Sequence, residues 1–458
     1  MPLYGSMSSH REFDVLLTFY NRFLLKMDAA IVDSTNPWGS YALQLYASRK
    51  APQPLGTVLF EEIEAKAKEK LKDCGAFMYA GGSAGTNSTE RANRKAFEKW
   101  AIIPRMLVNA TKRSLETTIF GVKHSSPVFI APIGVQAIFA KDAEFNPARA
   151  AQALGIPFIL STSASRSMEE IAKANGDGHR WYQLYWPRND DVTLSLLGRA
   201  KANNYKAIVL TVDSMSVAWR PGDINTSYIP FVHGVGVQVG KSDPVFMARY
   251  GKQPIMEGDH PEFPYDPAKF DRGILAGDDK IKEQSFLGTE WLKEANPGLH
   301  RTWADLKFVR DSWEGPLVLK GIQRVQDAEL AIDHGADGII VSNHGGRQID
   351  GAIPSLLALE TIMKSEKVKA AQAEGKFTVL FDSGIRTGSD IIKALALGAQ
   401  AVLLGRPWLY GSIVAGQDGV EQVLRHTLAD LDNTLGLAGF TSLDEVRGKG
   451  DEVLARIL

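Results

Sequence analysis

Short runs of apolar residues recur along most of the chain, separated by segments in which apolar and polar residues alternate with a helical period. Eight runs stand out: PVFIAP near 127, PFILST near 157, WYQLY near 181, AIVLTVD near 207, PLVLK near 316, GIIVSN near 338, TVLFD near 378 and AVLLG near 401. Each run has the character of a strand buried on both faces. The segments between them, such as MEEIAKA and SDIIKALALGA, place apolar residues three and four positions apart, which predicts helices.

Strands that alternate with helices predict a parallel sheet, and eight such units predict a closed (β/α)8 TIM barrel. The competing fold is an open doubly wound sheet, which needs a Gly-x-Gly-x-x-Gly turn after an early strand, and the sequence shows no such turn there. We place the barrel in residues 111–440. An N-terminal helical extension, residues 1–110, is expected to plug or cap the barrel, and a C-terminal tail covers residues 441–458.

One connection between strands is far longer than the others. Roughly a hundred residues separate Asp213 from Leu317, whereas the other strands follow one another within a few tens of residues. We therefore assign an insertion to residues 221–315, after the fourth strand. Because it is rich in Pro, Gly, Asp and Lys, we expect a long surface loop or lid rather than a second domain.

The composition indicates an ordinary globular protein. Of 458 residues, 44% are hydrophobic and 23% are charged, and the formal net charge is -1. Since the basic residues are scattered, nothing favours nucleic acid or an anionic membrane surface as a partner. No apolar run reaches the roughly 18 residues of a membrane span.

The protein is expected to be located in the cytoplasm. The most signal-like stretch, FDVLLTFYNRFLLKMDAAIV, is interrupted by Asp14, Asn21 and Arg22, which favours an amphipathic helix over a signal peptide. Cys74 is the only cysteine, so no disulfide can form within the chain, which fits a reducing compartment. The last three residues, RIL, lack the features of a peroxisomal Ser-Lys-Leu tail.

Polar or glycine residues follow every apolar run, at the strand ends where a parallel barrel places its active site. In chain order they are Gly134, Ser161, Gln183 with Tyr185, Thr211 with Asp213, Lys320, Ser342 with His344 and Arg347, Asp382 with Arg386, and Gly405 with Arg406. One such residue could be a cap or a turn. Eight strand ends that converge on one rim predict a site.

Two parts of this rim indicate different chemistry. The segments FDSGIRTGSD and LLGRP combine glycines, Arg386 and Arg406 with following helix N-termini, which suits a phosphate, although Gly384 and Gly405 could also serve tight turns alone. In SNHGGRQ, His344 can exchange a proton near neutral pH and Arg347 can bind a carboxylate. An isolated histidine is more often a hydrogen-bonded loop residue, but the neighbouring rim residues favour an acid substrate that loses a proton.

These motifs resemble a known family. TVD at 211, LVLKG at 317, SNHGGRQ at 342, DSGIRTG at 382 and LGRP at 404 are similar to the FMN-dependent L-2-hydroxy acid oxidases and dehydrogenases, the glycolate oxidase group, from about Glu61 to about Ala438. The resemblance implies FMN as cofactor, with its phosphate on Arg386, Gly405 and Arg406. The other implied FMN contacts are Pro132, Ile133, Gly134, Ser161, Gln183, Thr211, Lys320, Ser342, Asp382, Ser383 and Gly384.

The resemblance also implies catalytic and substrate-binding roles. His344 would be the base, removing either the Cα proton or the hydroxyl proton as hydride leaves, with Asp213 holding its imidazole. Lys320 would face the N1/C2 edge of the flavin. The implied substrate contacts are Tyr185 at the hydroxyl, and Arg220, Arg347 and Tyr79 at the carboxylate. A homo-oligomer, tetramer or octamer, is implied as well, and since no haem-binding or membrane-anchoring segment is visible we expect dioxygen as acceptor.

Within the family, three features lean toward the lactate 2-monooxygenase branch. They are the insertion with its lead-in VAWRPGDI, the segment PIG at 132–134, and Ser163, where glycolate oxidase carries a tryptophan. A lid that retains pyruvate and peroxide together would let them react to acetate, carbon dioxide and water. Ser163 and Gly134 are also expected to leave room for a substrate bulkier than lactate.

Several alternatives stay open. The first is a simple oxidase that releases hydrogen peroxide and acts on lactate, glycolate or a bulkier hydroxy acid. Alternatives of another class are a flavin barrel that is an isomerase, such as type 2 isopentenyl diphosphate isomerase, and a metabolite-binding protein. The isomerase is disfavoured because its diphosphate substrate would not require Arg220 and Arg347 placed for one carboxylate. The binding protein is disfavoured because it would be expected to have lost Lys320, His344 or Arg347, and all three are present.

Overall fold

The computed structural model of this chain describes residues 38–71 and 74–457. The amphipathic helix that we expect within residues 13–32 therefore lies outside the described residues. The cytoplasmic address, which rests partly on that stretch, stays a prediction.

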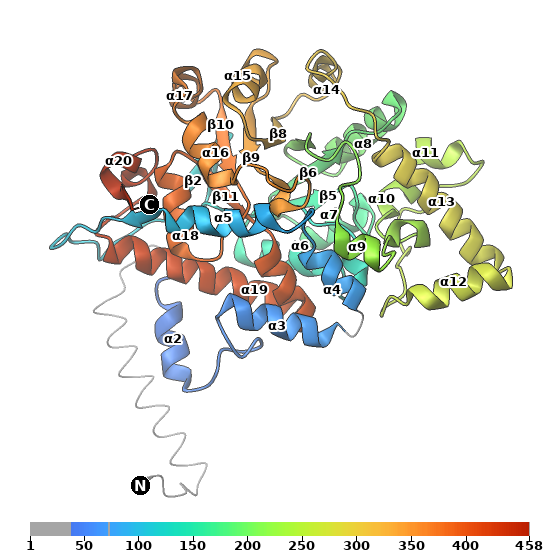
Figure 1. Cartoon of the computed structure of the whole chain (residues 1–458), viewed down its shortest axis with the longest axis horizontal. Helices are drawn as coiled ribbons and strands as arrows, with labels where there is room; N and C mark the ends of the chain where they lie inside the picture. The colour runs from blue at the N-terminus through green and yellow to red at the C-terminus, as the bar shows by residue number, and fades with distance from the viewer. Residues whose placement is uncertain (1–37, 72–73, 458) are drawn as a thin grey trace, which may run out of the picture.

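Eight parallel strands close into a barrel, which confirms the predicted (β/α)8 TIM barrel (Figure 1). Around the ring they are β4 (Val128–Ile130), β5 (Phe158–Ser161), β6 (Arg180–Tyr185), β7 (Ile208–Thr211), β8 (Leu317–Ile322), β9 (Gly338–Val341), β10 (Thr378–Phe381) and β11 (Ala401–Leu404). β11 pairs with β4 and so closes the ring. Each strand coincides with one of the eight apolar runs, although β6 begins one residue before its run and β8 ends two residues after its run. Nearly every strand residue is buried between the barrel interior and the outer helices.

Helices follow the strands and cover the outside of the barrel. They are α6 (Phe145–Leu154), α7 (Met168–Asn175), α8 (Asp190–Ala202), α14 (Leu306–Asp311), α15 (Val325–Asp333), α16 (Ser355–Ile362), α17 (Glu366–Ala373), α18 (Gly388–Ala396) and α19 (Arg406–Leu437). Local sequence fixes several of their starts. For example, Ser167 and Glu170 form a capping box at the start of α7, which satisfies backbone N–H groups that the first turn leaves free.

A β-hairpin closes the end of the barrel at which the strands begin. Its strands are β2 (Thr117–Ile119) and β3 (Val122–His124). Ile119 joins the inward-facing strand residues in an inner core, and the ring of Phe120 lies 5.6 Å from that of Trp181. We expected residues 1–110 to plug or cap the barrel, but the plug at this end comes from the next segment, because its two apolar residues at a tight turn fit the barrel interior.

The N-terminal extension lies partly at the opposite, active-site end. α4 (Cys74–Gly81) contributes to the cavity there, and α5 (Ser88–Glu98) contacts η3 (His344–Gly346). α2 (Tyr41–Ser48) and α3 (Phe60–Lys70) pack on α19. The last described elements are η4 (Leu443–Glu445), α20 (Gly450–Val453) and β12 (Leu454–Arg456), and β12 pairs with β1 (Trp100–Ile102) of the extension.

The insertion after β7 is helical, so the expectation of a surface loop was wrong in this respect. Its elements are α9 (Pro221–Asn225), η2 (Pro230–His233), α10 (Gln238–Lys241), α11 (Pro244–Ala248), α12 (Pro267–Ala276) and α13 (Asp279–Ala295), at the right in Figure 1. The prolines that suggested a loop begin helices, and Asp243, Asp266 and Asp278 cap helix N-termini. Trp291 of α13 packs against Phe246, with ring centroids 5.0 Å apart, and both residues belong to the hydrophobic core that the insertion shares with the barrel.

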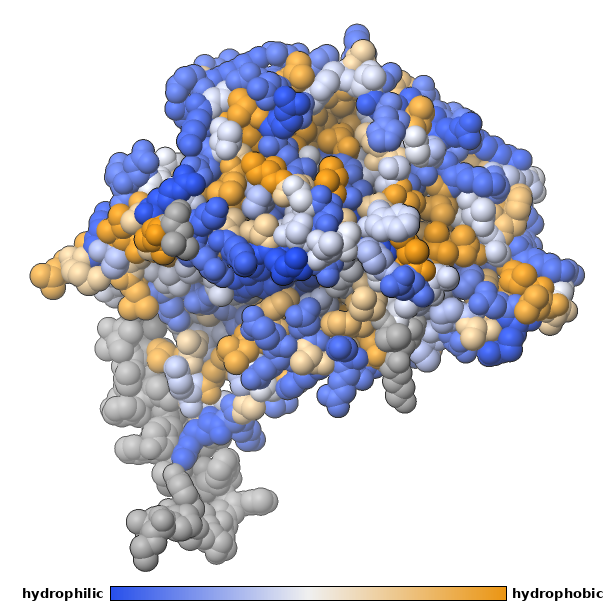
Figure 2. All heavy atoms as spheres, in the orientation of Figure 1, coloured by the Kyte–Doolittle hydropathy of each residue, from blue (hydrophilic) through white to orange (hydrophobic). Residues whose placement is uncertain are grey.

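The surface viewed in Figure 2 is largely hydrophilic, with apolar side chains in separate groups. None of the described helices is both long and apolar enough to cross a membrane.

Two histidines at the end of the barrel where the strands begin, the buried His124 and the partly buried His179, give a testable pH dependence. His124 and His179 have ring centroids 4.9 Å apart, and burial lowers the pKa of each to about 4. Since an unfolded histidine has a pKa of about 6.5, both contribute stability that is present above that pH and is lost as the pH falls toward 4. We expect the free energy of unfolding to fall in this window by up to ~1.4 kcal/mol per pH unit for each histidine.

Urea denaturation at about pH 7 and about pH 5 measures this loss. His124→Gln should show a smaller decrease than the wild type, and replacement of the exposed His300 by Gln serves as the matched control. Equal decreases in the wild type and His124→Gln would contradict the assignment.

Candidate active site

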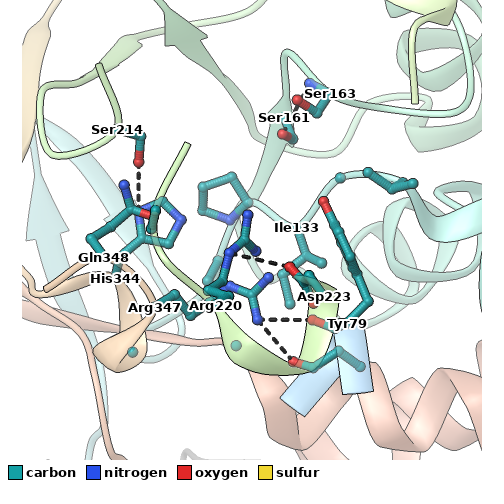
Figure 3. Close-up of a pocket in the computed structure, with 18 of the residues that line it drawn as sticks. Tyr79, Ile133, Ser161, Ser163, Ser214, Arg220, Asp223, His344, Arg347 and Gln348 are labelled. Carbon is teal, nitrogen blue, oxygen red and sulfur yellow. Dashed lines mark hydrogen bonds and ion pairs between the residues drawn. The ribbon is translucent and has the colours of Figure 1, made fainter. Parts of the chain in front are cut away.

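A cavity of about 470 Å³ opens at the carboxyl ends of the strands, where most predicted site residues meet (Figure 3). Those that line it are Tyr79, Pro132, Ile133, Gly134, Ser161, Tyr185, Arg220, Lys320, His344, Arg347, Asp382, Ser383, Gly384, Arg386, Gly405 and Arg406. Four further predicted site residues do not line the cavity and lie behind its lining residues: Gln183, Thr211, Asp213 and Ser342. Elements α4, α9, η2 and α13 complete the wall, so the extension and the insertion both contribute to the site.

His344 is paired with a buried carboxylate. Its Nδ1 lies 2.8 Å from Oδ1 of Asp213 and 3.2 Å from Oγ of Ser214, and Ser214 donates to the same Asp213 oxygen. Burial and the charge of Lys320 lower the pKa of His344, although Asp213 opposes this shift. A neutral imidazole whose Nδ1 proton points at Asp213 keeps Nε2 as its proton acceptor. The ring therefore suits a base.

The turn that carries His344 is held in an unusual conformation. His344, Gly345 and Gly346 all have positive φ, and only glycine adopts this readily, so His344 needs support from its surroundings. Asn343 and Asn93 of α5 exchange side-chain amide hydrogen bonds of 2.9 and 2.7 Å, and Asn343 also accepts from the N–H of Gly346. The N-terminal extension thus fixes the conformation of this turn.

Lys320 is buried between two carboxylates at the floor of the cavity. Its Nζ lies 3.6 Å from Asp382, 3.9 Å from Asp213 and 3.2 Å from the Ser342 hydroxyl. Burial lowers the pKa of Lys320, but the two carboxylates more than offset this, so it stays charged. Burial alone would raise the pKa of Asp213, but the charges of His344 and Lys320 outweigh this effect and lower the pKa to about 2. Gly321 permits this packing because a Cβ there would lie 2.6 Å from that of Asp213.

Two arginines flank one tyrosine on the opposite wall. The guanidinium groups of Arg220 and Arg347 each lie 5.5 Å from the ring centroid of Tyr79. Arg347 donates to the carbonyls of Tyr79 and Gly82, at 2.9 and 2.7 Å. Burial, together with the charges of Arg220 and Arg406, lowers the pKa of Arg347 to about 10. Crowded buried cations favour an anionic ligand.

A second cationic corner lies between β10 and β11. Neither Arg386 nor Arg406 forms an ion pair with a carboxylate in the described residues, and burial and the charge of Arg406 lower the pKa of Arg386 to about 10. Nε of Arg406 is buried and has no acceptor in the described part of the chain. α19 begins here without a side-chain cap, whereas the N-terminus of α18 is already capped by Thr387 and Asp390. Of the two helix N-termini proposed for a phosphate, only that of α19 is open to one.

Hydrogen-bonded side chains connect the inner strands behind the cavity. The Ser161 hydroxyl donates to the side-chain Oε1 of Gln183 at 3.2 Å, and Nε2 of Gln183 donates to the Thr211 hydroxyl at 3.0 Å. Ser342 accepts from the backbone N–H of His344 at 3.0 Å. This polar layer suits a planar ligand with several hydrogen-bonding atoms above it.

The space that we expected Gly134 to leave for a larger substrate is occupied by the backbone of Ser163. A Cβ on Gly134 would lie 2.5 Å from the carbonyl oxygen of Ser163, which accepts from the N–H of Val135 at 2.7 Å. The glycine therefore allows close approach of the β5 loop instead of enlarging the cavity. Ser163 itself lines the cavity.

Four residues of the site were not predicted from the sequence. Ser214 contacts His344, Asp223 forms an ion pair with Arg220, Gln348 donates to the carbonyl of Asp213 at 2.8 Å, and Asn296 of the insertion donates to the carbonyl of Ser214 at 2.9 Å. The contact of Asp223 could have been predicted, because Asp223 follows Arg220 by three residues and the intervening proline favours the start of a helix. Nothing in the sequence pointed to Asn296.

Comparison with known proteins agrees with this geometry. A family model described as FMN-dependent dehydrogenase matches residues 67–451. The chain belongs to this family. An FMN-dependent alpha-hydroxy acid dehydrogenase of Schizosaccharomyces pombe is 42% identical over 88% of this chain and 93% of its own length. An L-lactate oxidase of Lysinibacillus sphaericus is 36% identical over 87% of this chain and 92% of its own. A crystal structure of mandelate oxidase matches with a TM-score of 0.68, 34% identity and coverage of 87% and 98%.

Membership makes this protein an FMN-dependent oxidoreductase of alpha-hydroxy acids, and the residues present fit the cofactor. The buried Nε of Arg406 and the uncapped start of α19 suit the phosphate. The buried cation of Lys320 and the polar layer of Ser161, Gln183 and Thr211 suit the flavin ring.

Proposed function

We propose that this protein oxidises an L-2-hydroxy acid with an apolar, lactate-like or larger side chain to the 2-keto acid, with dioxygen as the final acceptor. The observation that carries the proposal is the placement of a carboxylate-paired histidine and of two arginines on one cavity. A base is thereby combined with a binding site for an acid. The relatives named as lactate oxidase and 4-hydroxymandelate oxidase support oxygen as acceptor.

In this proposal His344 takes the proton that the substrate loses. Its Nε2 is the free ring nitrogen, because Nδ1 faces Asp213 at 2.8 Å. Asp213 stabilises the imidazolium and stays ionised, since its pKa is about 2. When bound, FMN supplies a two-electron acceptor that dioxygen can reoxidise.

The remaining residues hold the substrate. Arg220 and Arg347 bind its carboxylate, and Tyr79 lies between their guanidinium groups. Burial raises the pKa of Tyr185 to about 12, so its hydroxyl keeps its proton and can donate to the substrate oxygen. The cofactor contacts are those that the resemblance implied, from Pro132 to Arg406.

The side chain of the substrate meets an apolar wall. It is formed by Val217, Ile224, Ile229, Phe231, Trp291 and Leu292, most of them from the insertion. Val217 and Ile224 are 61% and 45% exposed, so this wall reaches the cavity entrance. Apolar surface at the entrance favours hydroxy acids with more apolar surface than glycolate.

A second candidate, oxidative decarboxylation of the lactate 2-monooxygenase type, is favoured by the contact between the insertion and the catalytic pair. Asn296, just after α13, donates to the carbonyl of Ser214, beside His344. A wall tied to the site in this way can retain a keto acid beside peroxide.

Product analysis under air tests both candidates. With L-lactate, we expect pyruvate and hydrogen peroxide in equal amounts, whereas acetate and carbon dioxide would establish the monooxygenase. Rates with glycolate, lactate, 2-hydroxyhexanoate and mandelate should rise with apolar surface, by roughly tenfold per two added methylene groups. A flavin that no hydroxy acid bleaches without oxygen would refute the proposal and favour the non-oxidase alternatives.

A further inference from the structure

Asp223 places a carboxylate in a cavity that should bind one. It belongs to α9 and lines the cavity together with Arg220 (Figure 3). Its Oδ2 forms an ion pair with Nε of Arg220 at 3.2 Å, and neither this Nε nor the buried Oδ1 of Asp223 has a hydrogen-bond partner among the described residues. Burial raises the pKa of Asp223, while Arg220 and Arg347 oppose this shift. Burying a carboxylate with an unpartnered oxygen costs free energy, so we expect Asp223 to have a function that offsets this cost.

The contact engages only one side of the Arg220 guanidinium. Asp223 approaches Nε, and no acceptor in the described residues bonds to either terminal nitrogen of Arg220. The two terminal nitrogens form the edge that grips a carboxylate through two parallel hydrogen bonds. An arginine held at Nε therefore keeps its binding edge available.

The charges around the cavity also indicate that Asp223 positions Arg220. Arg220 and Arg347 flank Tyr79, and their like charges repel each other. Burial lowers the pKa of Arg347, and the charge of Arg220 lowers it further. With Asp223 the three groups carry one net positive charge, which matches a single carboxylate. Without it, repulsion would move Arg220, which is 15% exposed, away from Arg347.

Asp223 also lies close to the end of α4. A Cβ built on Gly82, just after α4, would be in van der Waals contact with Oδ1 of Asp223, at 3.4 Å. α4 also carries Tyr79, and α4 packs against α9. Asp223 thus lies where the extension and the insertion meet.

We propose that Asp223 is a positioning residue that holds Arg220 by its Nε side and so presents the terminal nitrogens to the substrate carboxylate. This inference rests on the proposed function. It predicts that loss of Asp223 weakens the recognition of a carboxylate and leaves the proton transfer at His344 intact.

Rapid mixing of the FMN-loaded protein with L-lactate or L-lactamide, without oxygen, tests this. We expect Asp223→Ala to raise the apparent Kd for lactate by about tenfold or more, with a limiting rate of flavin reduction within about threefold of wild type. The Kd for the neutral lactamide should not change. Asp223→Asn, which keeps the size of the side chain and removes its charge, should also weaken lactate binding, because the contact to Nε is an ion pair.

Asn225→Ala is the matched control on the same helix, because Asn225 is exposed and does not line the cavity. It should leave both Kd values at the wild-type level. Equal weakening of lactate and lactamide by Asp223→Ala, or no weakening of lactate, would overturn the positioning role. Failure of lactate and every other hydroxy acid to reduce the wild type would refute the proposed function instead.

Discussion

Replacement of His344 by alanine should slow reduction of the flavin by a 2-hydroxy acid by at least about a thousandfold, with FMN still bound. Among the side chains that line the cavity, His344 is the one that pairs a free ring nitrogen with a buried carboxylate partner. Its low pKa keeps the ring neutral and able to accept a proton near neutral pH. Without it, the proton of the substrate has no acceptor of matching strength.

Stopped-flow absorbance of the flavin measures this effect, and the visible spectrum after desalting reports FMN content. Ser214→Ala is a graded comparison, because it removes one contact to Nδ1 and leaves Asp213 in place. We expect Ser214→Ala to lower the rate of flavin reduction by about threefold to tenfold. Reduction of His344→Ala at the wild-type rate would show that another group takes the proton.

The barrel could be predicted because its strands carry a strong local signal. Strands such as β9 and β11 are buried on both faces, so each appears in the sequence as an apolar run with turn residues behind it. In a closed parallel barrel all carboxyl ends meet at one rim, so residues far apart in sequence could be grouped before their distances were known. Lys320 and His344 illustrate this, since both line the same cavity.

The rest depended on contacts that have no periodic signal. The insertion was misjudged because its prolines and aspartates begin and cap helices, whereas composition alone cannot distinguish a helix start from a loop. The amide pair of Asn93 and Asn343 and the bond from Asn296 to Ser214 join segments far apart in the chain. Gly134 was misread because its neighbour Ser163 is close only in the fold.

Lys320→Met should have the second largest effect, because it removes the cation that two buried carboxylates share. Methionine has a similar length and no charge, so Asp213 and Asp382 would lose their common partner, at 3.9 and 3.6 Å. Breaking a buried ion pair from one side costs about 3–5 kcal/mol of stability. The loss of a fixed positive charge should also make the bound flavin harder to reduce, so its reduction potential should fall and the rate with substrate should drop by about a hundredfold or more.

Lys241→Met separates the two consequences. Lys241 is a buried lysine of the insertion, paired with Asp259 at 2.6 Å, and it does not line the cavity. It should lower stability without changing the reduction potential or the rate. Adding Asp382→Asn to Lys320→Met should restore part of the lost stability, since one unpaired carboxylate disappears, but it should not restore the rate. A Lys320→Met protein with the wild-type potential and rate would show that the charge of Lys320 serves the fold alone.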